Sequence, residues 1–337
     1  MSLAGALKSA FEPVEEAVER GAIPGAVMGV IAPEGKPAVR WAGHAMLTPE
    51  QHGLDRATVF DLASLTKVIV TVTEILRLVE RGLIDLDDPL SLALPDLHQY
   101  TPAAPIRALT IRQCLTHEAG LPAVEPIYTW GSDPATLKTL VLQHDWPLGA
   151  PIYSDIGFIL LGLVIERFTG APLAQLPLPE GLTFAPDPAI TAATENCQWR
   201  GRVIRGQVHD ENAYALGGGA GHAGLFGSID GVLGFAGALM AGRVLPAASL
   251  AEMRRPQSPT RGLAWQRRHP GWAGGGLCSA ETLGHTGFTG TGLWLDFERG
   301  YAWALLTNRV HPSRHVETGI QALRRAVGNR LAAAWPF

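Results

Sequence analysis

The sequence has few of the residues that mark several common classes of protein. Its three cysteines, Cys114, Cys197 and Cys278, form no CxxC pair, so we expect buried free thiols rather than a disulfide or metal framework. No apolar run approaches the roughly 20 residues that cross a bilayer, so we expect no membrane span. The net charge is only −4, and no basic cluster is interleaved with aromatic residues. This excludes the usual electrostatic pattern of a nucleic-acid-binding protein.

The beginning and the size of the chain set two further expectations. The opening residues, MSLAGALKSAFEPVEE, lack the basic region of a signal peptide and soon reach glutamates, so we expect a cytoplasmic protein. Hydrophobic residues make up 47% and charged residues 17% of the 337 positions, which is typical of a well-buried globule. A chain of this length exceeds the usual size of one hydrophobic core and predicts two packed subdomains.

The two ends of the chain show related patterns of helix and strand. Near the start, apolar residues at helical spacing indicate a helix over residues 3–18, which we expect Pro13 to interrupt, and GAVMGVIAP and PAVRWAGHA predict a β-hairpin. Near the end, GLAWQRR, TGLWLDF and YAWALLTNRV predict strands, followed by a helix capped by Ser313.

Residues 63–231 predict short helices joined by Pro- and Gly-rich loops. Their end signals include a Thr110/Gln113 capping box, Asp133 before Pro134, and Gly170 after a long apolar helix, and Asp230 precedes a further helix. The predicted fold is therefore α+β, with an antiparallel sheet flanked by helices and formed by residues 1–62 and 232–337. The helical domain of residues 63–231 is inserted, and we expect the active site between the two domains.

Lysine is also scarce, at four residues against 23 arginines. A lysine can lose its proton whereas an arginine effectively cannot, which directs attention to Lys67 in the stretch DLASLTK. Ser64 lies three residues earlier, so both side chains share one face of a predicted helix, and a neutral lysine there could take the serine proton. Such an SxxK pair arises by chance about 0.13 times per chain of this composition, so an ordinary helix-start serine is the competing interpretation.

Two other stretches offer groups for acid–base chemistry and substrate binding. YSDIG contains Tyr153, whose phenol could shuttle a proton, and Asp155, which could equally be the N-cap of the next helix. GHTGFTGTG contains His285, Thr286 and Gly287 in a predicted edge strand, where glycine lets a substrate approach the backbone.

In this order, SLTK, YSD and HTG resemble the motifs of the penicillin-recognising serine hydrolases, in the branch of class C β-lactamases, DD-peptidases and related esterases. LIDLDDPL (83–90) and LTIRQCLTHEAGLP (109–122) are similar to flanking segments of that family. The resemblance implies the two-domain fold already predicted, a covalent acyl-enzyme and no cofactor or metal. It implies that Ser64 attacks a carbonyl, that Lys67 is the base, and that Tyr153 assists the leaving group and later activates water. The backbone N–H groups of Ser64 and Phe288 would hold the oxyanion, and Asp155, His285, Thr286 and Gly287 would line the substrate site.

Two residues depart from the family pattern. Asp155 replaces the usual asparagine and would favour a protonated Lys67, and His285 replaces the lysine of most β-lactamases. We therefore expect an esterase, an amidase or a D-amino-acid peptidase, acting on a small molecule or short peptide, rather than an efficient β-lactamase. A catalytically impaired penicillin-binding or ligand-binding member is the alternative.

Other candidate sites are weaker. GAGHAG (219–224) matches a dinucleotide-binding pattern, but it follows no convincing strand and no acidic residue lies about 20 positions later. There is no GxSxG, which argues against an α/β-hydrolase elbow. His209, Asp210, Glu211 and His222 could bind a metal, yet their separation fits no standard metal motif, so packing beside the active site is the favoured interpretation.

Overall fold

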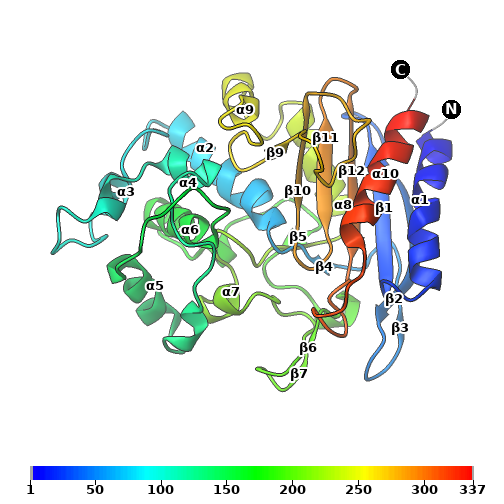
Figure 1. The fold of residues 1–337 in the computed structure, drawn as a ribbon, viewed down its shortest axis with the longest axis horizontal. Helices are drawn as coiled ribbons and strands as arrows, with labels where there is room; N and C mark the ends of the chain where they lie inside the picture. Colours follow the sequence, from blue (N-terminus) through cyan, green and yellow to red (C-terminus); the bar gives the residue numbers. More distant parts are fainter. Residues whose placement is uncertain (1–2, 336–337) are drawn as a thin grey trace.

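A computed structural model describes residues 3–335. Its centre is a seven-stranded antiparallel sheet with the order β3-β2-β1-β12-β11-β10-β9 (Figure 1). The strands are β1 (Gly25–Ile31), β2 (Ala38–Met46), β3 (His52–Gly53), β9 (Gln266–Arg267), β10 (Thr282–Thr286), β11 (Gly292–Asp296) and β12 (Tyr301–Thr307). Because β1 pairs with β12, the two ends of the chain form one sheet, and the predicted fold class is confirmed.

Helices cover both faces of this sheet. On one face, Met28 and Val30 of β1 pack in the same cluster as Val327 and Leu331 of α10 (Ile320–Ala334), which lies against α1 (Leu3–Glu19). On the other face, Val27 packs with α8 (Ile229–Met240). Side chains alternate between the faces of a strand, so β1 is buried on both sides and reads as a continuous apolar run.

The middle of the chain forms a mainly helical region beside the sheet (Figure 1). Its helices are α2 (Val72–Glu80), α3 (Leu90–Ala93), α4 (Ile111–Thr116), α5 (Pro134–Gln143), α6 (Asp155–Thr169) and α7 (Glu211–Ala215), followed after α8 by α9 (Ala247–Arg254). The single turns are η1 (Lys67–Thr71), η2 (Pro105–Ala108), η3 (Ile127–Thr129), η4 (Leu173–Gln175) and η5 (Pro188–Ile190). Small strands also occur here, namely β4 (Phe60–Asp61), β5 (Leu182–Thr183) and β8 (Phe226–Gly227) in one sheet, and β6 (Asn196–Cys197) with β7 (Arg202–Val203) in another.

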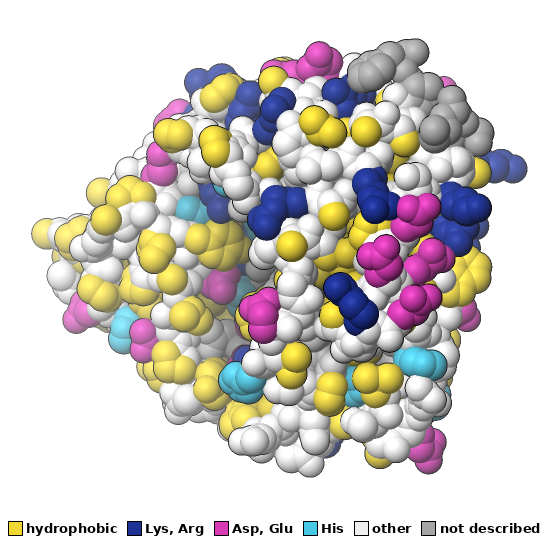
Figure 2. Space-filling view, turned by 45° about the vertical axis from the view of Figure 1, so that its right-hand side comes forward, with side chains coloured by type: hydrophobic (Ala, Val, Ile, Leu, Met, Phe, Trp, Pro, Cys, Tyr) yellow, Lys and Arg dark blue, Asp and Glu magenta, His cyan; other side chains and the backbone are white. Residues whose placement is uncertain are grey.

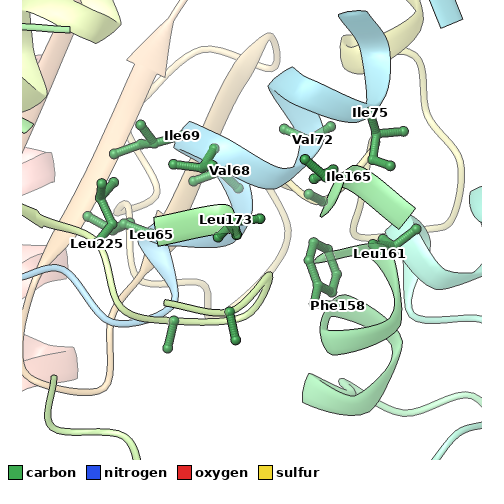
Figure 3. Packing of buried hydrophobic residues seen from close by; sticks show 14 of the residues in the cluster. Leu65, Val68, Ile69, Val72, Ile75, Phe158, Leu161, Ile165, Leu173 and Leu225 are labelled. Carbon is green, nitrogen blue, oxygen red and sulfur yellow. The ribbon is translucent and has the colours of Figure 1, made fainter. Parts of the chain in front are cut away.

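Burial of α6 anchors the segment that begins at Lys67. Figure 3 shows Val72 and Ile75 facing Leu161 and Ile165 of α6, and all four side chains are buried. Each such side chain stabilises the fold by about 1.5–3 kcal/mol when it leaves water. This apolar contact therefore holds η1 and the first turn of α2 firmly against α6.

Several of the predicted helix ends are confirmed. Thr110 and Gln113 form the expected capping box, Asp133 caps α5 by accepting from Thr136 N, and Gly170 ends α6 in the left-handed region. The three cysteines are free and buried, as expected. No helix within residues 3–335 is both long and apolar enough to span a membrane.

Two predictions about the terminal helices are wrong. Pro13 does not interrupt α1, because the Ser9 carbonyl that a proline leaves without a partner accepts from Arg330 of α10 instead. Ser313 does not cap the last helix, which begins at Ile320 after Gly319 turns in the left-handed region.

Two shorter expectations also need correction. Only Gln266–Arg267 of GLAWQRR forms a strand. The cap of α8 is Ser228, and Asp230 lies in its first turn.

One buried charge ties α10 to the sheet. The guanidinium of Arg324 donates to the carbonyls of Gly287 (3.0 Å) and Thr291 (2.6 Å), at the turn between β10 and β11. We expect Arg324→Met to lower the free energy of unfolding by about 2–4 kcal/mol, because the carbonyls of Gly287 and Thr291 each lose a charged donor and keep only a backbone N–H. Arg325→Met, on the exposed face of the same helix, should cost less than about 1 kcal/mol. Urea unfolding measures both, and equal losses would contradict the assignment.

Candidate active site

The turn that carries Ser64 is held by a network around Asp61. The buried Asp61 carboxylate accepts from Ala63 N (2.8 Å) and from His209 N (2.6 Å). Burial raises the pKa of Asp61, and these two N–H groups oppose that shift. Ala63 has a φ of +47°, a conformation that costs an ordinary residue about 1–2 kcal/mol. The network thus imposes a strained turn directly before the predicted nucleophile.

The turn after β10 packs onto the same segment. Thr289 donates to the Asp61 carbonyl (2.7 Å) and Thr291 to the Leu62 carbonyl (3.1 Å). A side chain at Gly287 would lie 2.6 Å from the Leu62 carbonyl, so only glycine permits this approach. Phe288 follows, half-exposed, with its ring stacked on His209. The structure therefore brings HTG and Phe288 against the turn that leads to Ser64.

Lys67 lies at the centre of the site. It is fully buried and is the first residue of η1, a single π-helical turn of a type that often occurs at functional sites. Its ammonium donates to Ser64 Oγ (3.0 Å) and to the His222 carbonyl (3.0 Å), and lies 2.6 Å from Asp155 Oδ1. The SxxK spacing thus joins Ser64 and Lys67 as the sequence predicted.

Tyr153 covers one side of Lys67. The lysine nitrogen lies 5.1 Å from the centre of the Tyr153 ring, which also packs against His117 at 4.3 Å. Burial by itself would lower the pKa of Lys67, but Asp155 and Tyr153 outweigh it, so the pKa is raised. Lys67 is therefore an ammonium in the resting site.

The alternative role of Asp155 as a helix cap is wrong. Ser154 is the N-cap of α6, since its hydroxyl accepts from Gly157 N, and Asp155 is the first helical residue. This position leaves the Asp155 carboxylate free to reach Lys67. The substrate-binding role predicted for it is therefore accompanied by a direct ion pair with the predicted base.

His285 is buried and neutral. Its Nδ1 lies 3.0 Å from the Thr286 carbonyl, so Nδ1 carries the proton, and the buried Nε2 has no partner among residues 3–335. Burial, with Arg261 and Lys67 nearby, keeps the pKa of His285 well below its usual value. Its ring lies 6.1 Å from that of Tyr153. His285 therefore supplies no positive charge to the site.

Sequence reasoning missed His117 and Arg261. His117 accepts from Ser154 N at Nδ1 (3.0 Å), and its buried Nε2 has no partner in the described part of the chain. The Arg261 guanidinium lies 5.3 Å from the centre of the Tyr153 ring and donates to the Ala264 carbonyl. His117 falls inside the quoted segment LTIRQCLTHEAGLP, whereas no local pattern singles out Arg261, because only the fold brings it to Tyr153.

The Gly-rich segment 219–224 has a structural role at the site. A side chain at Gly221 would lie 1.9 Å from the Phe158 carbonyl, so glycine is needed for this loop to pack on α6. Thr71 donates to the Gly221 carbonyl (2.6 Å), and the next residue, His222, presents its carbonyl to Lys67. The close packing of Gly221 on α6 thus places the His222 carbonyl beside the Lys67 ammonium.

The proposed metal ligands are only partly brought together. Asp155, Asp210 and His222 place ligand atoms within 4.8 Å of one another. His209 instead contacts Glu195 (3.2 Å), and Glu211 contacts Arg314 (2.6 Å). The Lys67 ammonium already lies against Asp155 and the His222 carbonyl, and its charge opposes a metal ion there. The absence of a metal remains a prediction.

Known proteins resemble this chain over most of its length. Residues 12–327 match the family model described as Beta-lactamase. A putative D-alanyl-D-alanine carboxypeptidase of Salmonella agona (strain SL483) is 32% identical over 310 residues, covering 75% of this chain and 70% of the relative. An N-acetylmuramyl-L-alanine amidase of Bacillus subtilis (strain 168) is 29% identical over 307 residues, covering 75% and 68%. The solved structure of EstCE1, a hydrolase with promiscuous acyltransferase activity, aligns with a TM-score of 0.72 at 24% identity, covering 96% of this chain and 99% of that chain.

The buried side chains of His285 and His117 make the stability of the fold dependent on pH. Burial also keeps the pKa of His117 well below its usual value, while an unfolded histidine titrates near about 6.5. Below that pH the unfolded chain binds more protons, so the free energy of unfolding should fall by up to about 1.4 kcal/mol per pH unit for each histidine. Urea unfolding at pH 7.5, 6.5 and 5.5 should show this loss, and His285→Gln should reduce the slope. The exposed His315 offers a control, and an unchanged slope in His285→Gln would contradict the expectation.

Proposed function

From the premise that this chain belongs to the beta-lactamase family, a family of hydrolases, we propose that it cleaves an ester, an amide or a short peptide through an acyl-enzyme on Ser64. The observation that carries the proposal is the 3.0 Å contact between Ser64 Oγ and a buried Lys67 Nζ. A serine needs an adjacent base to become a useful nucleophile, and a buried amine is such a group. Family membership confirms the resemblance drawn from SLTK, YSD and HTG.

The proposed reaction uses the groups gathered around this pair. Ser64 attacks the carbonyl carbon while its proton passes to Lys67. The backbone N–H groups of Ser64 and Phe288 stabilise the oxyanion, a type of contact worth about 3–4 kcal/mol for each donor. Tyr153 then delivers a proton to the leaving group, and later helps a water molecule to attack the acyl-enzyme. The inter-strand turn at Gly287 supports this arrangement because it packs on Leu62, two residues before Ser64.

Among substrates, the site favours an esterase, amidase or D-amino-acid peptidase over an efficient β-lactamase. His285 is neutral where β-lactamases usually have a lysine, so it holds a substrate carboxylate weakly. Arg261 has no carboxylate partner within residues 3–335, and it lies over Tyr153. A partly buried guanidinium is costly without an anion, so we propose that Arg261 pairs with a carboxylate of the substrate. The carboxypeptidase named among the relatives is consistent with such a substrate.

A catalytically impaired binding protein is the second candidate, and the ion pair between Asp155 and Lys67 is the observation that favours it. The joint presence of Ser64, Lys67 and Tyr153 around one point argues for turnover. The proposal also includes a cytoplasmic location, which the three free thiols support because disulfides are rare in that compartment.

Covalent labelling tests the nucleophile. We expect a penicillin, a fluorophosphonate or an activated short-chain ester to add one acyl or phosphonyl group to the wild-type protein and none to Ser64→Ala, because the Ser64 hydroxyl is hydrogen-bonded to the buried amine of Lys67. Intact mass spectrometry measures the adduct, and the fastest probe ranks the substrate classes. Folded wild-type protein that none of the three probes labels would favour the binding protein.

Paired substrates test Arg261. For Arg261→Gln we expect kcat/KM to fall about 10- to 100-fold on a peptide with a free C-terminal carboxylate, the scale of one lost charge-assisted hydrogen bond. The same peptide with an amidated C-terminus should be cleaved at nearly the wild-type rate. Arg255→Gln, which removes an exposed arginine paired with Glu252, is the matched control. Equal losses on both peptides would rule out recognition of the carboxylate.

A further inference from the structure

The Lys67 ammonium, which also contacts the Tyr153 ring, has three oxygen atoms at close range. They are Ser64 Oγ at 3.0 Å, the His222 carbonyl at 3.0 Å and Asp155 Oδ1 at 2.6 Å. An ammonium with three donors has no lone pair, so in this state Lys67 donates to Ser64 and cannot take its proton. Lys67 must lose a proton before it can act as the base.

Of these three partners only Asp155 is a good proton acceptor. A backbone carbonyl and a serine hydroxyl are very weak bases, whereas carboxyl groups are ionised at neutral pH. Asp155 is also the nearest of the three, and it is the only carboxylate ion-paired with Lys67 in residues 3–335. Tyr153 faces Lys67 as well, but it offers a hydroxyl rather than a carboxylate. The asparagine usual in the family offers an amide, whose oxygen can accept a hydrogen bond but is too weakly basic to take a proton from an ammonium.

We propose that Asp155 takes the proton from the Lys67 ammonium and thereby makes Lys67 the base for Ser64, an inference that rests on the proposed acyl-enzyme. The ammonium and carboxylate first become a neutral amine and a carboxylic acid. The amine then takes the Ser64 proton as Oγ forms its bond to the carbonyl carbon. When the bond to the leaving group breaks, one proton passes from the Asp155 acid through Tyr153 to that group. Lys67 is then an ammonium and Asp155 a carboxylate, as before.

A second carboxylate favours this transfer. Asp210 and Asp155 place oxygen atoms within 4.8 Å of each other, and their repulsion is relieved when one of them is protonated. Asp210 is held in its charged form, because His222 Nε2 (2.8 Å) and Ala213 N (2.8 Å) both contact its Oδ1. Burial acts to raise the pKa of Asp210, but His222, Ala213 N and Lys67 lower it overall. The proton therefore goes to Asp155. His117, His285 and Arg261 also face this cluster, and none of them is an anion.

The dependence of acylation on pH tests the transfer in the unaltered enzyme. If Asp155 accepts the proton, the reactive amine–acid form is a constant fraction of the ion pair, so the rate of labelling by a fluorophosphonate should be level through neutral pH. If Lys67 instead loses its proton to water, the rate should rise about tenfold per pH unit up to the pKa of Lys67, which is raised above the usual value. A tenfold rise per unit from pH 6 to pH 9 would overturn the proposal.

Substitution of Asp155 separates proton transfer from simple electrostatics. Asp155→Asn should label at least about 100-fold more slowly than wild type at pH 7, the scale of general acid–base catalysis, and should recover as pH rises. Asp155→Glu should restore the rate to within about tenfold. Asp145→Asn removes an exposed carboxylate 3.8 Å from His98 and is the matched control. If Asp155 only hinders Lys67, Asp155→Asn should label as fast as wild type or faster, and that result would overturn the proposal.

The scarcity of lysine permits a direct check of the base. With only four lysines, ¹³C-labelled lysine should give a simple spectrum in which the Lys67 signal is the one missing from Lys67→Arg. We expect Lys67 to lose its proton at lower pH in Asp155→Asn, yet to react more slowly. A lower pKa with faster labelling would contradict the transfer. A folded wild type that forms no Ser64 adduct would overturn the proposed function and with it this inference, whereas equal labelling of wild type and Asp155→Asn would overturn this inference alone.

Discussion

The burial of one ammonium group governs the design of this site. Lys67 has no exposed surface, and removing an unpaired charge from water costs several kcal/mol. The fold meets this cost with three polar partners, namely the nearby Ser64 and, from distant parts of the sequence, Asp155 and the His222 carbonyl. Each partner has its own support, such as the close packing of Gly221 on α6. Packing around the lysine therefore also orders the groups that would take part in catalysis.

The sheet contributes through a second constraint. Thr289 and Thr291, from the turn after β10, bind the backbone of Asp61 and Leu62, and Arg324 binds the other side of that turn. The strained Ala63 and the half-exposed Phe288 are consequently held on adjoining segments. A rigid backbone of this kind suits an oxyanion site, because preorganised donors need no rearrangement during the reaction. On the face of the molecule in Figure 2, basic and acidic side chains lie close together.

The chemistry of the site differs from the family pattern in a consistent way. Asp155 adds a negative charge beside Lys67, and the neutral His285 stands where β-lactamases usually have a positive lysine. Arg261, which lies outside the HTG motif, places a positive charge beside Tyr153. The charges of the site are thus redistributed, while the Ser64 and Lys67 pair keeps its geometry.

Local patterns in the sequence determined much of this protein. Spacing alone placed Ser64 beside Lys67, and the strand patterns at both ends predicted the shared antiparallel sheet, because periodicity and i, i+3 contacts are local properties. Long-range contacts decided the rest. Pro13 stays helical because Arg330 supplies a donor from the other end of the chain, and Asp155 is an ion-pair partner because Ser154 takes the cap. Arg261, His117 and the His222 carbonyl reach the site only through tertiary packing, since residues far apart in sequence carry no signal of their separation in space.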